Sequence, residues 1–166
     1  MERRPPYGSY AAIMGGFAAA LAGAGGLARR FDRNPACQRG LDLVVLSLAS
    51  FKAARTLAND QVTSFLRAPF VQGEAHKGDE ETPVEGGMEQ AIGELVTCSR
   101  CVGTWAAAGL AFAQILAPRT GRLLSWSLAA AGANDFLQAA FAALTSKANV
   151  IEAQEVVERQ RPQRAA

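Results

Sequence analysis

The sequence predicts an all-α integral membrane bundle of about four transmembrane helices with a short interfacial helix, and three observations support this class. Four apolar blocks alternate with polar loops along the 166 residues. Two of these blocks carry no charge over a length that crosses a bilayer. Neither shows the polar face that a surface helix of a soluble bundle needs. We expect a multi-pass protein of the cell membrane, and a soluble bundle with core helices that are apolar all round is the alternative.

The first block covers residues 7–28 and contains no charged residue. At about 1.5 Å per residue, a helix of this length spans the hydrocarbon core of roughly 30 Å. The block is rich in Gly and Ala, which let a second helix approach closely, so it predicts a homo-oligomer or a larger membrane complex. The alternative is a cleaved signal peptide, because Arg3 and Arg4 precede the block and Ala22-Gly23-Ala24 is typical of a cleavage site.

The second and third blocks predict helices near 41–58 and 101–118. The second ends in Lys52 and Arg55, whose long side chains can reach the headgroups. The third carries no charge, and we expect it to end at Pro118.

The fourth block, near 122–146, has a polar centre. An ionised Asp135 at mid-membrane costs at least ~2.5 kcal/mol, so it needs a partner. The expected intramembrane polar network comprises Asp135, Asn134, Gln138, Arg55 and Lys52. A structural contact, a proton or ion path in a small pore or transporter, and a block that ends early at the headgroups are the alternatives for Asp135.

The connecting segments are polar. We expect a flexible acidic loop near 74–87 and a polar C-terminal tail over 148–166 that forms a fraying helix. A short interfacial helix is predicted near 60–67, with Arg67 on lipid phosphate or paired with Glu94.

Charge excludes one class of partner and leaves orientation open. The formal net charge is +2 and no basic stripe alternates with aromatic residues, so nucleic acid is not an expected partner, whereas the lipid bilayer is. Basic residues near the predicted membrane ends are balanced between the two sides. An even number of spans places both termini together, and we expect them in the cytoplasm with the cysteine pair.

Cys98 and Cys101 form a Cys-x-x-Cys pair just before the third block. Two such thiols can share a metal or form a disulfide, and Arg100 between them favours thiolate. A closed zinc site needs about four ligands, and the chain adds only His76 and Cys37, so no cofactor is predicted. Zinc shared across a dimer, thiol redox chemistry, and plain packing as small apolar residues remain alternatives.

Three stretches together resemble a known group: LASFKAARTLANDQVTSFLRAPF (48–70), GELVTCSRCVGTWAAAGLAF (93–112) and LAAAGANDFLQ (128–138). They are similar to the small bacterial membrane proteins grouped as domain of unknown function thirteen-sixty, over about residues 41–147. The family often has Pro and an aromatic residue after the first cysteine, where this chain has Ser99 and Arg100. The matching positions are Arg55, Asp60, Thr63, Arg67, Pro69, Glu94, Cys98, Cys101, Gly103 and Trp105.

The resemblance implies a multi-span bacterial membrane protein without a known activity. It divides the chain into an additional helix and basic loop (1–40), a family-like domain (41–147) and the tail (148–166). With one histidine and no glycine-rich phosphate loop after a strand, no complete catalytic set is visible. The expected function is a non-catalytic membrane subunit or scaffold, with the thiol-redox or metal-binding protein and the pore or transporter as alternatives.

Overall fold

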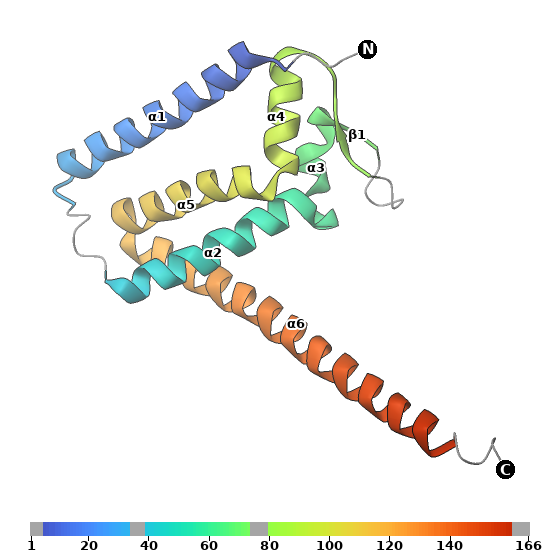
Figure 1. Ribbon diagram of the computed structural model, residues 1–166. Helices are drawn as coiled ribbons and strands as arrows, with labels where there is room; N and C mark the ends of the chain where they lie inside the picture. Colours follow the sequence, from blue (N-terminus) through green and yellow to red (C-terminus); the bar gives the residue numbers. More distant parts are fainter. Residues whose placement is uncertain (1–4, 34–38, 74–79, 161–166) are drawn as a thin grey trace. The chain divides into compact units, whose positions relative to one another are not determined.

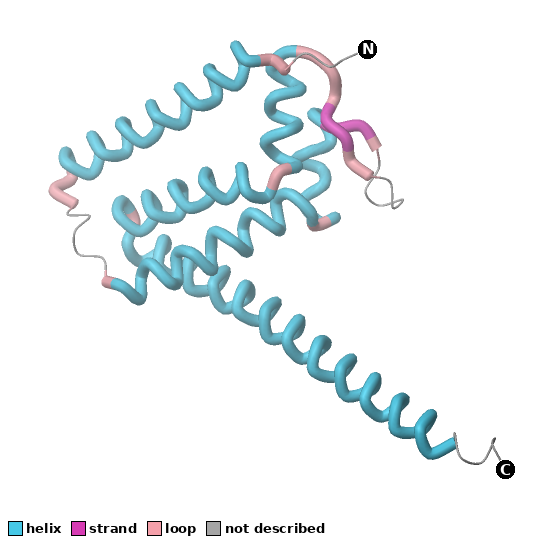
Figure 2. The backbone as a smooth tube through the Cα atoms, viewed as in Figure 1, coloured by secondary structure: helices cyan, strands magenta, loops and turns pink. Residues whose placement is uncertain are grey.

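A computed structural model describes residues 5–33, 39–73 and 80–160, and this part of the chain is almost entirely helical (Figures 1 and 2). The predicted all-α class is confirmed. The chain divides into two units, Met1–Ala131 and Gly132–Ala166, which are described separately.

The long helices follow the apolar blocks. They are α1 (Tyr7–Arg30), α2 (Gly40–Asn59), α5 (Ser99–Leu116) and α6 (Pro118–Gln160). The first three lie within a few residues of their predicted bounds. The fourth begins earlier than predicted and continues without a break into the tail, which was predicted as a separate fraying helix, because no Gly or Pro interrupts the chain before Pro162.

The turn between α5 and α6 corrects the expected role of Pro118. This residue does not close α5 but occupies the first position of α6, where its missing N–H costs no hydrogen bond. Gly121 lies one turn further along, and a Cβ there would come within 2.3 Å of the Ala113 backbone. The glycine therefore lets α6 begin directly against the end of α5.

Helix α4 (Gly87–Thr97) was not predicted, and it begins where the expected acidic loop near 74–87 ends. It starts at a turn in which Gly86 and Gly87 both have positive φ, a conformation that glycine adopts without a steric penalty. Its axis is bent by 83° from that of α5, and Cys98 stands at the break (Figure 1).

The segment after α2 consists of short elements. They are η2 (Gln61–Thr63), α3 (Ser64–Arg67), η3 (Ala68–Phe70) and the antiparallel strands β1 (Val71–Gln72) and β2 (Thr82–Pro83). Val71 pairs with Pro83, and Gln72 with Thr82 (Figure 2). A flexible loop was expected over 74–87. Its residues 80–87 instead form β2 and the entry to α4, while residues 74–79 lie outside the described part.

Gly93 explains how α4 packs on this hairpin. A Cβ at Gly93 would lie 2.4 Å from the Phe70 carbonyl oxygen and 3.1 Å from the Pro83 Cβ. The helix and the hairpin therefore meet at backbone distance, and only glycine fits between them.

The core of the first unit lies between α2, α5 and the first turns of α6. Val45, Ala49 and Ala129 are buried there, with leucines of all three helices around them. Gly103 of α5 faces the buried Ala54, and a Cβ at Gly103 would be 3.7 Å from the Ala54 methyl group. Gln114 donates a 2.8 Å hydrogen bond to the hydroxyl of Ser125, which is completely buried. Small residues and one satisfied polar pair thus join these helices closely.

Helix α1 contacts α4 and α5 but leaves most of its surface open. The Phe17 ring lies edge-on to Trp105 of α5, with 4.9 Å between ring centroids. Among the described residues, α1 is the one helix long and apolar enough to cross a membrane, and 6% of its apolar window is buried. The bent pair α4 and α5 would add a second span if the two helices are counted together. The predicted four spans are therefore not confirmed.

The second unit consists, in its described residues, of the remainder of α6 from residue 132 to 160. Large apolar side chains of this stretch are exposed, among them Phe136, Leu137, Phe141 and Leu144.

Candidate functional site

The cysteine pair lies at the break between α4 and α5. Cys98 caps α5: its sulfur accepts the backbone N–H of Cys101 at 3.3 Å, and its carbonyl oxygen accepts the N–H of Val102 at 3.0 Å. The two thiols also influence each other, because the interaction between them lowers the pKa of Cys98 and raises that of Cys101 to about 11. The loop conformation of Cys98, with the next residue opening a helix, therefore places both thiols against each other.

The electrostatic surroundings favour the thiolate of Cys98. Its pKa lies below its ordinary value, first because the Cys101 thiol donates to the sulfur. The backbone N–H groups of Cys101 and Arg100 and the positive charge of Arg100 act in the same direction, while partial burial opposes them. Cys98 is half-buried and Cys101 exposed, and both are free thiols. This arrangement has the features of a reactive cysteine pair.

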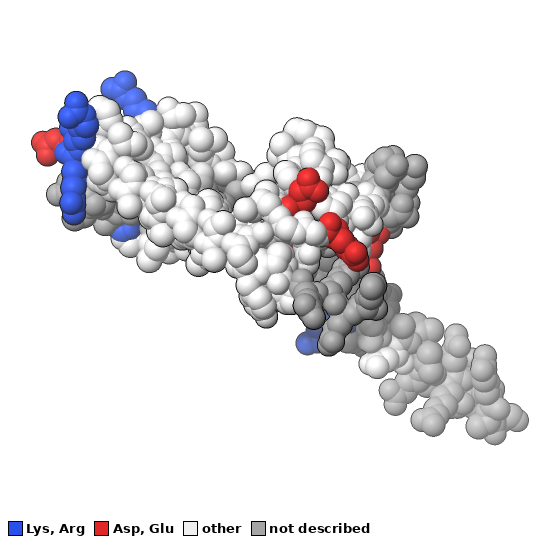
Figure 3. All heavy atoms as spheres, turned by 90° about the horizontal axis from the view of Figure 1, so that it is seen from above, with Lys and Arg blue, Asp and Glu red and all other residues white. Residues whose placement is uncertain are grey.

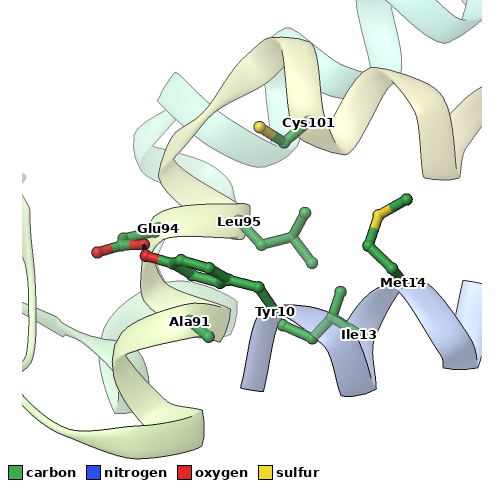
Figure 4. A pocket seen from close by; sticks show the side chains of 7 residues that line it. All are labelled: Tyr10, Ile13, Met14, Ala91, Glu94, Leu95 and Cys101. Atoms are coloured by element: carbon green, nitrogen blue, oxygen red, sulfur yellow. Dashed lines mark hydrogen bonds between the residues drawn. The ribbon is translucent and has the colours of Figure 1, made fainter. Parts of the chain in front are cut away.

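A cavity of about 180 Å³ adjoins the pair between α1, α4 and α5. Its apolar wall comprises Ile13, Met14, Ala91 and Leu95, with Cys101 at its edge. In Figure 4, Tyr10 reaches from α1 to Glu94 on α4, and its hydroxyl donates a hydrogen bond to that carboxylate. The cavity is thus apolar with one polar end.

Glu94 is held by two helices. Besides the Tyr10 hydroxyl it accepts a 2.9 Å hydrogen bond from the Gln90 side chain, whose oxygen accepts the N–H of Gly86. Sequence reasoning offered Arg67 as its partner, and that expectation is wrong.

Arg67 is instead paired with Glu81. The guanidinium is bound by both carboxylate oxygens, at 2.7 and 3.2 Å, and Arg67 is 1% exposed. The predicted contact with lipid phosphate is likewise wrong, because the guanidinium points into the protein. It is completely surrounded by protein acceptors.

The remaining donors of Arg67 close the end of α2. One nitrogen donates to the carbonyl oxygens of Leu57 and Asp60, at 2.7 and 3.2 Å, and to the Thr63 hydroxyl at 3.1 Å. Thr63 in turn donates to the carbonyl oxygen of Thr56. The residues Asp60, Thr63 and Arg67 therefore belong to one structural cluster. We call it the arginine cluster, and it comprises Thr63, Arg67, Glu81 and the end of α2 up to Asp60. Pro69 follows in the exposed η3 turn.

Glu81 was missed by sequence reasoning. The one signal available was that an arginine in an otherwise apolar segment needs an acidic partner, and the acidic run from Asp79 to Glu81 lies close by in sequence. The missing information was the hairpin that brings Glu81 back to α3.

The expected intramembrane network is divided between the two units. Lys52 and Arg55 belong to the first unit, where the Arg55 guanidinium lies 5.8 Å from the centre of the Phe51 ring. Asn134, Asp135 and Gln138 belong to the second unit. The pairing of Asp135 with a base of α2 therefore stays a prediction.

The described residues contain no cluster of side chains that supports the alternative of a metal site. Within 5–33, 39–73 and 80–160, no group of three or more His, Cys, Asp or Glu side chains is placed to hold a metal ion. Cys37 and His76 lie outside these residues, so zinc shared between two chains stays a prediction.

Comparison with known proteins confirms the resemblance. The family described as "Protein of unknown function (DUF1360)" matches residues 45–141. The chain is 38% identical over 99 residues to the Sporulation protein YjcA of Bacillus subtilis (strain 168), which covers 56% of this chain and 84% of that protein. It is 28% identical over 106 residues to the UPF0713 protein YngL of the same organism, covering 60% and 78%. No solved structure matches. The chain belongs to the DUF1360 family, whose activity is unknown.

Proposed function

We propose that this chain is a multi-span membrane protein that acts as a non-catalytic subunit or scaffold. The observation that carries the proposal is the exposed apolar surface of the helices. Large apolar side chains stand open on α1, α2 and the start of α6, among them Met14, Leu27, Leu43, Val44 and Leu123. Soluble monomers rarely expose apolar patches of this extent, because each exposed Å² forgoes about 25 cal/mol.

Charge bounds this apolar surface at both ends, as a bilayer requires. The arginines gather where α1 ends, α2 begins and α5 turns into α6: Arg29, Arg30, Arg33, Arg39, Arg119 and Arg122 (Figure 3). Acidic residues lie toward the opposite end, on α4, the hairpin and the end of α2: Asp60, Glu80, Glu81, Glu85, Glu89 and Glu94.

This distribution supports an orientation. The excess of Arg on one side of the membrane favours the cytoplasm for that side. The basic end is then cytoplasmic, and Cys98 and Cys101, at the other end of α5, face away from the cytoplasm. In the sequence, the basic residues were balanced between the two sides, and the cysteine pair was expected in the cytoplasm. We now propose the reverse orientation, because Arg67, one of the basic residues counted on the cysteine side, is buried and paired.

The surface of α1 supports the scaffold role. A Cβ built on Gly15, Gly16, Gly23, Gly25 or Gly26 would meet no atom within 4 Å. These small residues leave a smooth face on which a helix of a partner, or of a second copy, can pack at backbone distance. Because one relative is named as the Sporulation protein YjcA, we extend the proposal to a membrane process in sporulation. The test is whether this chain restores sporulation in a Bacillus subtilis strain that lacks YjcA.

The test of membrane insertion is alkaline extraction of membranes containing the full chain, followed by intact mass measurement. The proposal expects the protein to stay in the membrane pellet at the full mass of 17.4 kDa. Release into the supernatant would contradict insertion. A mass shortened at Ala22-Gly23-Ala24 would show that α1 is a signal peptide and remove the scaffold face.

Oligomerisation is tested separately by cross-linking in membranes. The variant Gly15→Leu, Gly16→Leu is expected to lose cross-linked species, whereas the matched variant Gly15→Ala, Gly16→Ala, which keeps the same face small, retains them. Equal cross-linking of both variants would contradict a packing role for the glycines.

A further inference from the structure

We infer that Cys98 and Cys101 form a dithiol site that exchanges with disulfides of protein segments carrying an apolar residue beside the cysteine. This goes beyond the scaffold role, which uses neither thiol. Three features of the first unit support it: the placement of the two sulfurs, their access to solvent, and the cavity beside them.

The two sulfurs are placed for transfer between them. Residues three positions apart on a helical turn are neighbours, and here the backbone N–H of Cys101 donates a 3.3 Å hydrogen bond to the Cys98 sulfur. Cys98 stands at the break between two helices inclined by 83° and caps the second one. An anionic sulfur there is stabilised by the N–H groups of the first turn of α5 and by Arg100.

The pair has the exposure that exchange requires. Cys98 is half-buried and Cys101 exposed, so an incoming disulfide can reach the pair. The contrast with a structural thiol is clear, because structural cysteines are buried in apolar surroundings and are inert.

The reaction balances without any further cofactor. The Cys98 thiolate attacks one sulfur of the substrate disulfide, the substrate S–S bond breaks, and the departing thiolate takes a proton. Cys101, deprotonated, then attacks the Cys98 sulfur of the mixed disulfide and releases the second substrate thiol. Two electrons pass from the dithiol to the substrate disulfide, which is the oxidant, and the protein is left with a Cys98–Cys101 disulfide.

The cavity selects the substrate class. Its lining includes Ile13, Met14, Ala91 and Leu95, with Cys101 at one end and Leu95 and Met14 nearest to it, and its volume of about 180 Å³ accommodates an apolar side chain (Figure 4). Glu94 is the acidic residue of the lining, and its carboxylate accepts hydrogen bonds from Tyr10 and Gln90. Arg100 lies beside the pair, so charge alone does not select the substrate; the apolar wall gains contact with a Leu or Ile beside the cysteine, and glutathione disulfide offers it no such side chain.

The test uses the full chain in detergent with the substitution Cys37→Ser, so that Cys98 and Cys101 are the only cysteines able to react. The reduced protein is mixed with one of three disulfides: a cystine-linked peptide with Leu beside each cysteine, the same peptide with Glu, or glutathione disulfide. Intact mass follows formation of the intramolecular disulfide. We expect the Leu peptide to react about tenfold faster than the Glu peptide, the factor that burial of part of one apolar side chain supplies.

Variants assign the roles of the two cysteines and of the cavity. Cys101→Ala is expected to trap a mixed disulfide on Cys98, and Cys98→Ala to trap much less on Cys101. Met14→Gln at the cavity wall lowers the preference for the Leu peptide, while the matched Met88→Gln, on a methionine outside the lining, leaves it unchanged.

Two results would overturn the inference. If the folded protein forms no intramolecular disulfide with any of the three reagents, while urea-unfolded protein does, the pair is not an exchange site. If the Glu peptide or glutathione disulfide reacts as fast as the Leu peptide, the substrate class is wrong. Because the measurement is made in detergent, neither result depends on membrane insertion or orientation.

Discussion

The arginine cluster and the cysteine pair lie in the same stretch of family-like sequence. Their polar atoms differ in the number of hydrogen-bond partners and in solvent exposure. Every donor of Arg67 named above has a protein acceptor, and the guanidinium is shielded from solvent. The Cys98 sulfur accepts one backbone N–H at the start of α5, and both free cysteines can be reached from outside. Saturated, buried polar groups fix a fold, whereas accessible groups with a stabilised anion are available for chemistry.

The largest expected effect comes from removing the carboxylate of the arginine cluster. Glu81→Ala leaves a buried, unpaired guanidinium, which typically costs about 3–5 kcal/mol. We expect a large drop in the free energy of unfolding, measured by denaturant titration in detergent. The neighbouring Glu80 is exposed, and Glu80→Ala is the matched control with little effect. A loss below about 1 kcal/mol for Glu81→Ala would place the pair among weak surface ion pairs.

The second prediction concerns two glycines, whose substitution by alanine should change the stability in opposite directions. Gly93→Ala puts a methyl group on the Phe70 carbonyl, so the backbone must shift at a cost of about 1–3 kcal/mol. Gly109→Ala, in the middle of α5 with open space around it, should stabilise by about 0.5–1 kcal/mol. Thermal unfolding of both variants measures the contrast. Equal shifts would mean that α4 does not pack on the hairpin at backbone distance.

The third prediction concerns the pH dependence of Cys98 alkylation. Because the pKa of Cys98 is lowered, more of it is thiolate near neutral pH than of an ordinary cysteine. Its alkylation by iodoacetamide should therefore reach half its maximal rate at a lower pH. Cys101→Ala removes the largest stabilising contact, so the pKa of Cys98 should rise and alkylation at neutral pH should slow severalfold. An unchanged pH profile in that variant would show that Cys101 does not stabilise the thiolate.

The sequence predicted what depends on local composition. The uncharged runs of α1 and α5 and the apolar first half of α2 indicated helices close to those observed. The apolar residues Met88, Ala91, Ile92 and Leu95 stand at helical spacing in α4, but two glycines and an acidic neighbourhood made the region resemble a loop. Pro118 was expected to end a helix, although proline is also common at the first position of a helix.

The candidate site was predicted in part. The position of Cys98 and Cys101 at the start of a helix follows from the apolar run after them. Two other features depend on contacts between distant segments: Glu81 returning to Arg67 through the hairpin, and Tyr10 reaching Glu94 across 84 positions. Neither contact has a periodic signature in the sequence. The cavity beside Cys101 is missed for the same reason, because α1 supplies one of its walls.

The chain carries its own control for the central claim, which is that a membrane separates the basic end from the cysteine pair. Cys37 lies in sequence between Arg33 and Arg39 of the basic end, whereas Cys98 and Cys101 lie at the other end of α5. The measurement is labelling of reduced, intact cells with a membrane-impermeant maleimide, comparing Cys37→Ser with the variant Cys98→Ser, Cys101→Ser. We predict labelling of Cys98 and Cys101 in intact cells and of Cys37 only after the membrane is opened. Labelling of Cys37 from outside with protection of the pair, or labelling of all three together, would contradict it.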